Sequence, residues 1–142
     1  MMQTFVDTTK WKFKKRALEQ ILATKIPILV NECSQEIMRA TIQNLSGPQI
    51  KPGVTGAREI GKMPVPRRTG MLVHSVKNVS VGYGARMIYA DEKVANYAKY
   101  VHNGTRKMRP RRFLGDVVRE RRQAFENRWR YTLINAINKV GQ

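Results

Sequence analysis

Residues 114–141 read LGDVVRERRQAFENRWRYTLINAINKVG and hold the most regular hydrophobic pattern in the chain. Asp116 suits the positive start of a helix there, while Lys139 and Gly141 suit its end. The pattern predicts a helix of about 24 residues within 114–140. Its apolar positions recur at helical spacing and are Leu114, Val117, Val118, Phe125, Trp129, Leu133, Ala136, Ile137 and Val140.

A second helical pattern covers residues 7–45, where Asp7, Thr8 or Thr9 can cap the start. Proline suits the first turn of a helix and not its interior, so Pro27 predicts a kink or a break in this helix. The pattern then continues to Leu45, before a Ser-Gly-Pro stop at 46–48. The apolar positions are Trp11, Leu18, Ile21, Leu22, Val30, Cys33, Ile37, Met38, Thr41, Ile42 and Leu45.

Residues 46–68 contain four glycines and four prolines and show no sustained period. Segments of this length without regular structure are uncommon in compact domains, and they are usually functional or become ordered on a partner. We expect an extended arm here, which includes Pro64, Pro66, Arg67 and Arg68.

Apolar alternation over 72–81 predicts a strand with a bulge near Lys77 and Asn78. Gly82, Tyr83 and Gly84 indicate a turn, and 87–90 would form the second strand of a hairpin. Residues 94–104 fit either a helical turn or the start of a strand, and we interpret them as a short helix that leads into a brief extended piece.

These patterns predict one α+β domain over 1–142. It would hold a helical region (7–45), an arm (46–68), a β-rich part with a short helix (69–105) and a C-terminal helix (114–140). We expect a small, mostly antiparallel sheet with the long C-terminal helix packed on it. The opening residues show no signal peptide, and no run of about 18 apolar residues predicts a membrane span.

Charge is the outlying property, with 27 Lys and Arg against 10 Asp and Glu and a net charge of +17. Such a charge favours acidic partners, namely nucleic acid, an anionic membrane surface or an acidic protein surface. Two clusters concentrate it. We name the basic strip as Arg106, Lys107, Arg109, Arg111 and Arg112, and the N-terminal basic face as Lys10, Lys12, Lys14, Lys15 and Arg16.

The basic strip has features of a docking surface, although a charge run can also be a solvated face. Four of its five cations are Arg, whose planar guanidinium binds carboxylate or phosphate through two hydrogen bonds. Pro110 stiffens the segment, so less entropy would be lost on binding.

The chain shows no pattern of an enzyme or a cofactor site. The two histidines, His74 and His102, lie far apart in sequence, and Cys33 has no second thiol. His74 and Ser75 would point to opposite faces of a strand and could not form a nucleophile–base pair. The ten acids are scattered, which is not the pattern of a metal-dependent nuclease. We expect the tyrosines at 83, 89, 97 and 100 to pack in the core or in an interface.

Two stretches resemble a known family. PVPRRTGMLVHSV (64–76) resembles a segment in which a proline-rich arm gives way to TGxLxxS, and YAKYVHNGTRKMRPRRFL (97–114) is similar to YAxYVExGTxxMxxRPFL. Both patterns are those of small tail-completion or head-tail joining proteins of tailed bacteriophages. The resemblance covers about 64–120 and departs at His102 and Arg112. Its matching residues are Thr69, Gly70, Leu72, Ser75, Tyr97, Ala98, Tyr100, Val101, Gly104, Thr105, Met108, Phe113 and Leu114.

The resemblance implies a structural virion protein at the head-tail junction, present in the host cytoplasm during assembly. By analogy it would form a ring with copies of itself, preferably six-fold, and contact tail terminator, tube, connector or head-closure proteins. Neither motif is catalytic. The strip would meet an acidic ring surface or passing DNA, and no membrane partner is expected. The alternative is a basic nucleic-acid-binding module for DNA packaging or ribosome association, which lacks support from aromatic residues within the basic runs.

Overall fold

The computed structural model describes residues 8–47 and 69–141. Its fold is α+β, as predicted. The predicted C-terminal helix and the predicted short helix near residue 100 are both confirmed. In chain order the elements are α1 (Thr8–Leu45), α2 (Met71–Ser75), β1 (Val76–Gly82), β2 (Ala85–Ala90), α3 (Ala98–Asn103) and α4 (Gly115–Gly141). The arm residues from Pro48 to Arg68, Pro64 and Pro66 among them, and the capping residue Asp7 lie outside the described residues.

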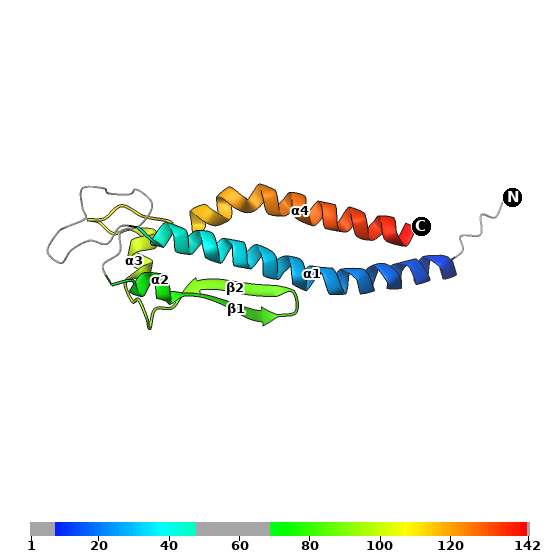
Figure 1. Cartoon of the computed structure of the whole chain (residues 1–142), viewed down its shortest axis with the longest axis horizontal. Coiled ribbons are helices and arrows are strands. Elements are labelled where there is room, and N and C mark those ends of the chain that lie inside the picture. The colour runs from blue at the N-terminus through cyan, green and yellow to red at the C-terminus, as the bar shows by residue number, and fades with distance from the viewer. Residues whose placement is uncertain (1–7, 48–68, 142) are drawn as a thin grey trace.

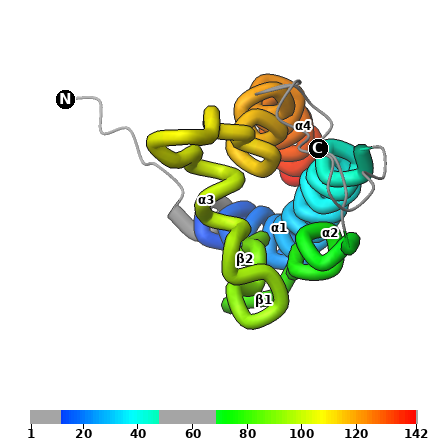
Figure 2. Tube along the Cα trace, turned by 90° about the vertical axis from the view of Figure 1, so that its left-hand side faces the viewer, coloured from blue at the N-terminus to red at the C-terminus, as the bar shows by residue number. Residues whose placement is uncertain are grey.

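Helix α1 is the middle of three layers, with α4 and the β1–β2 hairpin as the outer two. Figure 1 shows α4 along one side of α1 and the β1–β2 hairpin along the other, and the end view in Figure 2 shows the same order. The predicted packing of the C-terminal helix on the sheet is therefore wrong. The reason is that α1 offers contacts on two sides: Glu36 bonds Arg128 of α4, while Ser34 bonds Asn78 of the hairpin.

Helix α1 runs through Pro27 without a break, contrary to the predicted interruption. A proline in a helix interior leaves the carbonyl four residues earlier without its N–H donor. That carbonyl belongs to Ala23, and it accepts a hydrogen bond from the Tyr83 hydroxyl at the hairpin turn. The turn also packs closely on the helix, since a Cβ added to Gly84 would lie 3.0 Å from the Cγ2 of Ile26. A tertiary contact thus replaces the missing helical bond.

The hairpin begins later than its sequence pattern predicted. Residues 72–75 belong to α2, and β1 starts at Val76. In a helix, residues three apart share a face, so Leu72 and Ser75 are both buried, whereas a strand would point them to opposite sides. The strands pair from Val76 with Ala90 to Ser80 with Arg86, and the irregularity falls between Ser80 and Gly82, not at Lys77.

The core lies at the C-terminal end of α1, where several short segments converge. Leu45 of α1 is 1% exposed, and Phe113, just before α4, is 3% exposed. The buried cluster there consists of Leu45, Leu72, Val76, Ala95, Ala98 and Phe113. Because α2, α3 and Phe113 all contribute to this core, it holds both ends of the segment between α3 and α4.

Candidate functional site

The first part of the basic strip forms a tight turn. Thr105 and Met108 exchange backbone hydrogen bonds of 2.8 and 3.1 Å, and the Thr105 hydroxyl accepts a 3.3 Å bond from the Lys107 N–H. Gly104 enters the turn with φ of 79°, a region that favours glycine. A Cβ there would lie 2.7 Å from the Pro110 nitrogen and 2.8 Å from the Met108 oxygen. The turn therefore needs glycine at position 104.

The second part of the strip is attached to the fold through its backbone. The Arg111 N–H donates to the Val101 carbonyl of α3 at 2.9 Å. Phe113 is buried, its ring meets the His102 imidazole edge-on at 5.1 Å, and its carbonyl accepts a 3.4 Å bond from Asn44 of α1. The strip is therefore held at its first end by the Thr105–Met108 turn and at its second end by the buried Phe113.

The side chains of the strip extend from this frame. Arg106, Lys107, Arg109 and Arg112 are exposed, and Arg111 is half-buried. No carboxylate of residues 8–47 or 69–141 forms an ion pair with the four exposed cations. The nearest acid along the chain, Asp116, pairs with Arg119 at 3.2 Å. The strip is a cationic surface on a fixed backbone.

The N-terminal basic face lies far from the strip. Lys12, Lys14, Lys15 and Arg16 are exposed, and Lys15 pairs with Glu19 at 3.8 Å, while the side chain of Lys10 lies outside the description. Figure 1 places this end of α1 opposite the end that carries α3. The 38 residues of α1 span about 57 Å at 1.5 Å per residue. The structure does not bring the two basic clusters together.

The residues that carry the family resemblance are mostly structural. Leu72, Ala98 and Phe113 lie in the buried cluster, and Leu114 packs against it. Ser75 is fully buried and its hydroxyl donates to the Leu72 carbonyl at 2.7 Å. Gly70 has φ of 76° before α2, and the Thr69 hydroxyl accepts a 3.4 Å bond from Met71 N–H.

The tyrosines, by contrast, are at the surface. Tyr83 is 72% exposed and Tyr100 51%, while Tyr89 and Tyr97 are over a third exposed. The core alternative is therefore wrong for these four side chains, and packing in an interface stays a prediction. Lys99 lies over the Tyr100 ring at 5.4 Å, which is a cation–π contact on the outer side of α3.

His102 stabilises the start of α4. Its Nε2 accepts a 3.4 Å bond from the Gly115 N–H, and its Nδ1 lies 3.0 Å from the Asn103 side-chain oxygen. The first N–H groups of a helix have no acceptor within the helix, and the imidazole supplies an acceptor for one of them. In the pattern that this stretch resembles, an acid stands at the position of His102. This role is visible only in three dimensions, because His102 and Gly115 are 13 residues apart.

Groups for catalysis do not converge in the described part of the chain. His74 and Ser75 lie on α2, so the strand argument used against them was wrong, but buried Ser75 bonds the backbone and cannot be reached as a nucleophile. No group of three His, Cys, Asp or Glu side chains in residues 8–47 and 69–141 is placed to hold a metal ion.

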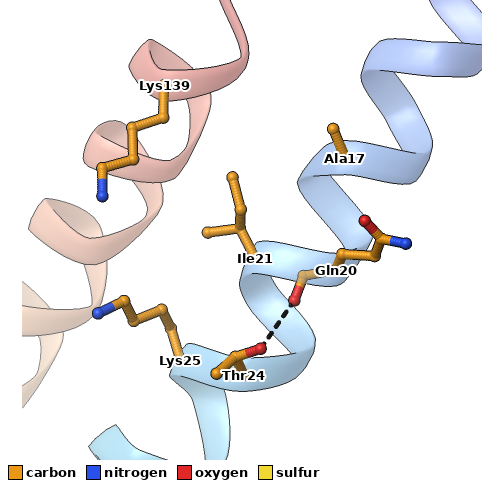
Figure 3. A pocket seen from close by; sticks show the side chains of 6 residues that line it. All are labelled: Ala17, Gln20, Ile21, Thr24, Lys25 and Lys139. Carbon is orange, nitrogen blue, oxygen red and sulfur yellow. Dashed lines mark hydrogen bonds between the residues drawn. The ribbon is translucent and has the colours of Figure 1, made fainter.

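A shallow pocket of about 370 Å³ lies between the N-terminal half of α1 and the end of α4. Figure 3 shows Lys139 on α4, Lys25 on α1 with its side chain extending toward α4, and the Thr24 hydroxyl bonded to the Gln20 carbonyl. Ala17 and Ile21 complete the lining. The pocket lining contains no acid, histidine or thiol.

Sequence reasoning missed a charged cluster between α1 and α4. Glu36 accepts a 2.9 Å bond from Arg128 and lies 3.7 Å from Arg121. The bond to Glu36 raises the pKa of Arg128. Cys33 is buried beside this cluster, and desolvation raises the pKa of its thiol while nearby Arg128 opposes that shift. Since 92 residues separate Glu36 from Arg128, no local pattern could have paired them.

Sequence reasoning also missed how much apolar surface stays open. The hairpin outer face, which we define as Val81, Met87 and Tyr89, is exposed on the sheet, and the α4 apolar face, defined as Leu133, Ile134 and Ile137, is exposed on the helix. Ile134 and Ile137 are each more than half exposed. Singly exposed apolar residues are ordinary, but two groups of neighbours are a feature of surfaces that meet a partner.

None of the helices in the described residues is both long and apolar enough to cross a membrane. Comparison of the chain with protein-family models, with curated proteins and with solved structures gives no match.

Proposed function

We propose that the chain is a structural assembly protein of a tailed bacteriophage, which acts at the head-tail junction and joins tail and connector rings. The resemblance of residues 64–120 to tail-completion and head-tail joining proteins motivates the proposal. The geometry of these stretches supports the proposal. They form part of the core and a turn, and they contribute no converging catalytic groups.

The observation that carries the proposal is the open apolar surface. The hairpin outer face and the α4 apolar face lie on the two outer layers, on either side of α1. A two-stranded hairpin is at best marginally stable alone and gains from a partner that covers its second face. A subunit that finishes its burial on neighbours would have these features, as interfaces are built around apolar centres.

The experiment is a mass measurement of the purified protein, alone and mixed with tails extracted from phage particles. We expect a ring of identical subunits, with six copies as the preferred number by analogy, or incorporation into the tail end. A protein that stays monomeric over a wide concentration range and does not join tails would contradict the proposal.

The second candidate, a nucleic-acid-binding module, is favoured by the exposed cations of the basic strip. The mass measurement separates the two functions, since a binding module needs neither self-assembly nor tails. DNA binding by itself does not separate them, because a junction protein also meets DNA.

A further inference from the structure

We infer that the basic strip binds the phosphate backbone of duplex DNA. Four exposed cations of the strip follow within seven positions, on a backbone that Thr105, Met108 and Arg111 fix through hydrogen bonds. The inference goes beyond the proposed assembly role and does not depend on it, because a single subunit carries the whole strip.

The backbone of the strip is pre-organised. The paired backbone bonds of Thr105 and Met108, the glycine-only conformation of Gly104 and the Arg111 bond to Val101 hold the main chain before any ligand arrives. Little conformational entropy is then lost in the backbone on binding, so more of the electrostatic attraction contributes to affinity.

The charge of the strip also favours DNA binding. Arg106, Lys107 and Arg109 have no carboxylate partner among the described residues, so their charges are not neutralised within the fold. Residues 97–112 contain no acid at all. Duplex DNA carries one negative charge per ~1.7 Å of its axis, and each cation that neutralises a phosphate releases a counterion and adds affinity.

The composition of the strip favours DNA over an acidic protein surface. Hot spots of protein interfaces are enriched in Trp, Tyr and Arg, and they lie in well-packed, desolvated pockets near the centre. In the strip the one long apolar side chain, Met108, is half-buried. Phosphate contacts need only charge and hydrogen-bond donors and carry no sequence information, which is what Arg and Lys on a turn supply.

The strip variant replaces Arg106→Gln, Lys107→Gln and Arg109→Gln. The matched control removes the same charge from the N-terminal basic face, through Lys12→Gln, Lys14→Gln and Arg16→Gln. All six side chains are exposed, so both variants should keep the fold, which thermal melting by circular dichroism checks. A smaller variant, Arg106→Gln with Lys107→Gln, covers the case in which the triple change disturbs the turn.

Binding is measured by fluorescence anisotropy with a labelled random-sequence duplex over a series of salt concentrations. We expect the strip variant to bind roughly a hundredfold more weakly at ~0.1 M salt. The slope of log K against log salt should become less negative by about 2.7, at about 0.9 for each lost phosphate contact. In the smaller variant the slope should become less negative by about 1.8 on the same rule. The control should change the slope much less.

Three results would overturn the inference. The unaltered chain does not bind the duplex; or the strip and control variants lose affinity equally, which indicates diffuse charge; or labelled polyglutamate binds more tightly than DNA at the same salt and loses that binding in the strip variant. The last result would assign the strip to an acidic protein. The mass of the assembly is measured separately, so a failure here leaves the assembly test intact.

Discussion

The Tyr83 hydroxyl donates a hydrogen bond to the carbonyl of Ala23, the helical carbonyl that Pro27 leaves without an N–H donor. The contact joins the tip of the hairpin to the middle of the long helix, 60 residues away in sequence. It explains how α1 passes a proline and why the hairpin lies along that side of α1.

Tyr83→Phe should lower the free energy of unfolding by about 0.5–1.5 kcal/mol, the usual net value of one hydrogen bond. Pro27→Ala restores an N–H that can bond Ala23, so in that background the Tyr83→Phe cost should shrink toward zero. Urea denaturation of the four proteins in this double-mutant cycle measures the coupling. Equal costs in both backgrounds would show that the hydroxyl does not serve this carbonyl.

Gly104→Ala should destabilise the protein by at least about 2 kcal/mol, because a Cβ would meet backbone atoms of Met108 and Pro110 at a positive φ. Gly141→Ala is the matched control, since nothing lies within 4 Å of its added Cβ and alanine favours helix. Thermal melting distinguishes them. A Gly104 variant that melts like the control would mean that the turn has another conformation.

Glu36→Gln should cost about 1 kcal/mol, because Glu36 holds Arg128 and Arg121 of α4 and is only partly exposed. Glu19→Gln is the control, as its pair with Lys15 is mostly solvated and should contribute close to nothing. Urea denaturation at low and high salt measures the free energy of unfolding of both variants. If the two substitutions have the same effect, the α1–α4 cluster is no stronger than a surface pair.

The Cys33 thiol should react slowly with a thiol reagent at neutral pH and rapidly in denaturant. The side chain is buried, and desolvation raises its pKa above the ordinary value of about 9.0, so the reactive thiolate is disfavoured. Because the native pKa is the higher one, the thiol's contribution to stability is complete below pH 9.0 and is lost as the pH rises through the native pKa. Denaturation with and without Cys33→Ala across that range measures it. A pH-independent difference between the two proteins would contradict this reasoning.

If the chain assembles as proposed, Met87→Lys with Val81→Lys should shift its mass to that of smaller species, because the charges would be buried with the hairpin outer face. Asn96→Lys with Gln123→Lys adds the same charge at exposed polar positions and should leave assembly unchanged. Sedimentation gives the masses, and circular dichroism confirms that both variants fold. If both pairs disrupt assembly alike, added charge and not the hairpin face is responsible.

The sequence by itself determined the C-terminal helix and the hairpin turn, because local forces set them. The spacing of apolar residues from Val117 to Val140 is enough for α4, and the Gly-Tyr-Gly run at 82–84 is enough for the hairpin turn.

Only the tertiary structure decided the rest, because it depends on contacts between distant residues. Pro27 predicts a break until the Tyr83 hydroxyl takes over the orphaned carbonyl, and residues 72–75 alternate like a strand until their burial favours a helical turn. The layer order follows from α1 bonding Arg128 on one side and Asn78 on the other, and the distance between the two basic clusters follows from the length of α1. The composition shows how large the positive charge is, but only the fold shows that the two basic clusters lie at opposite ends of α1.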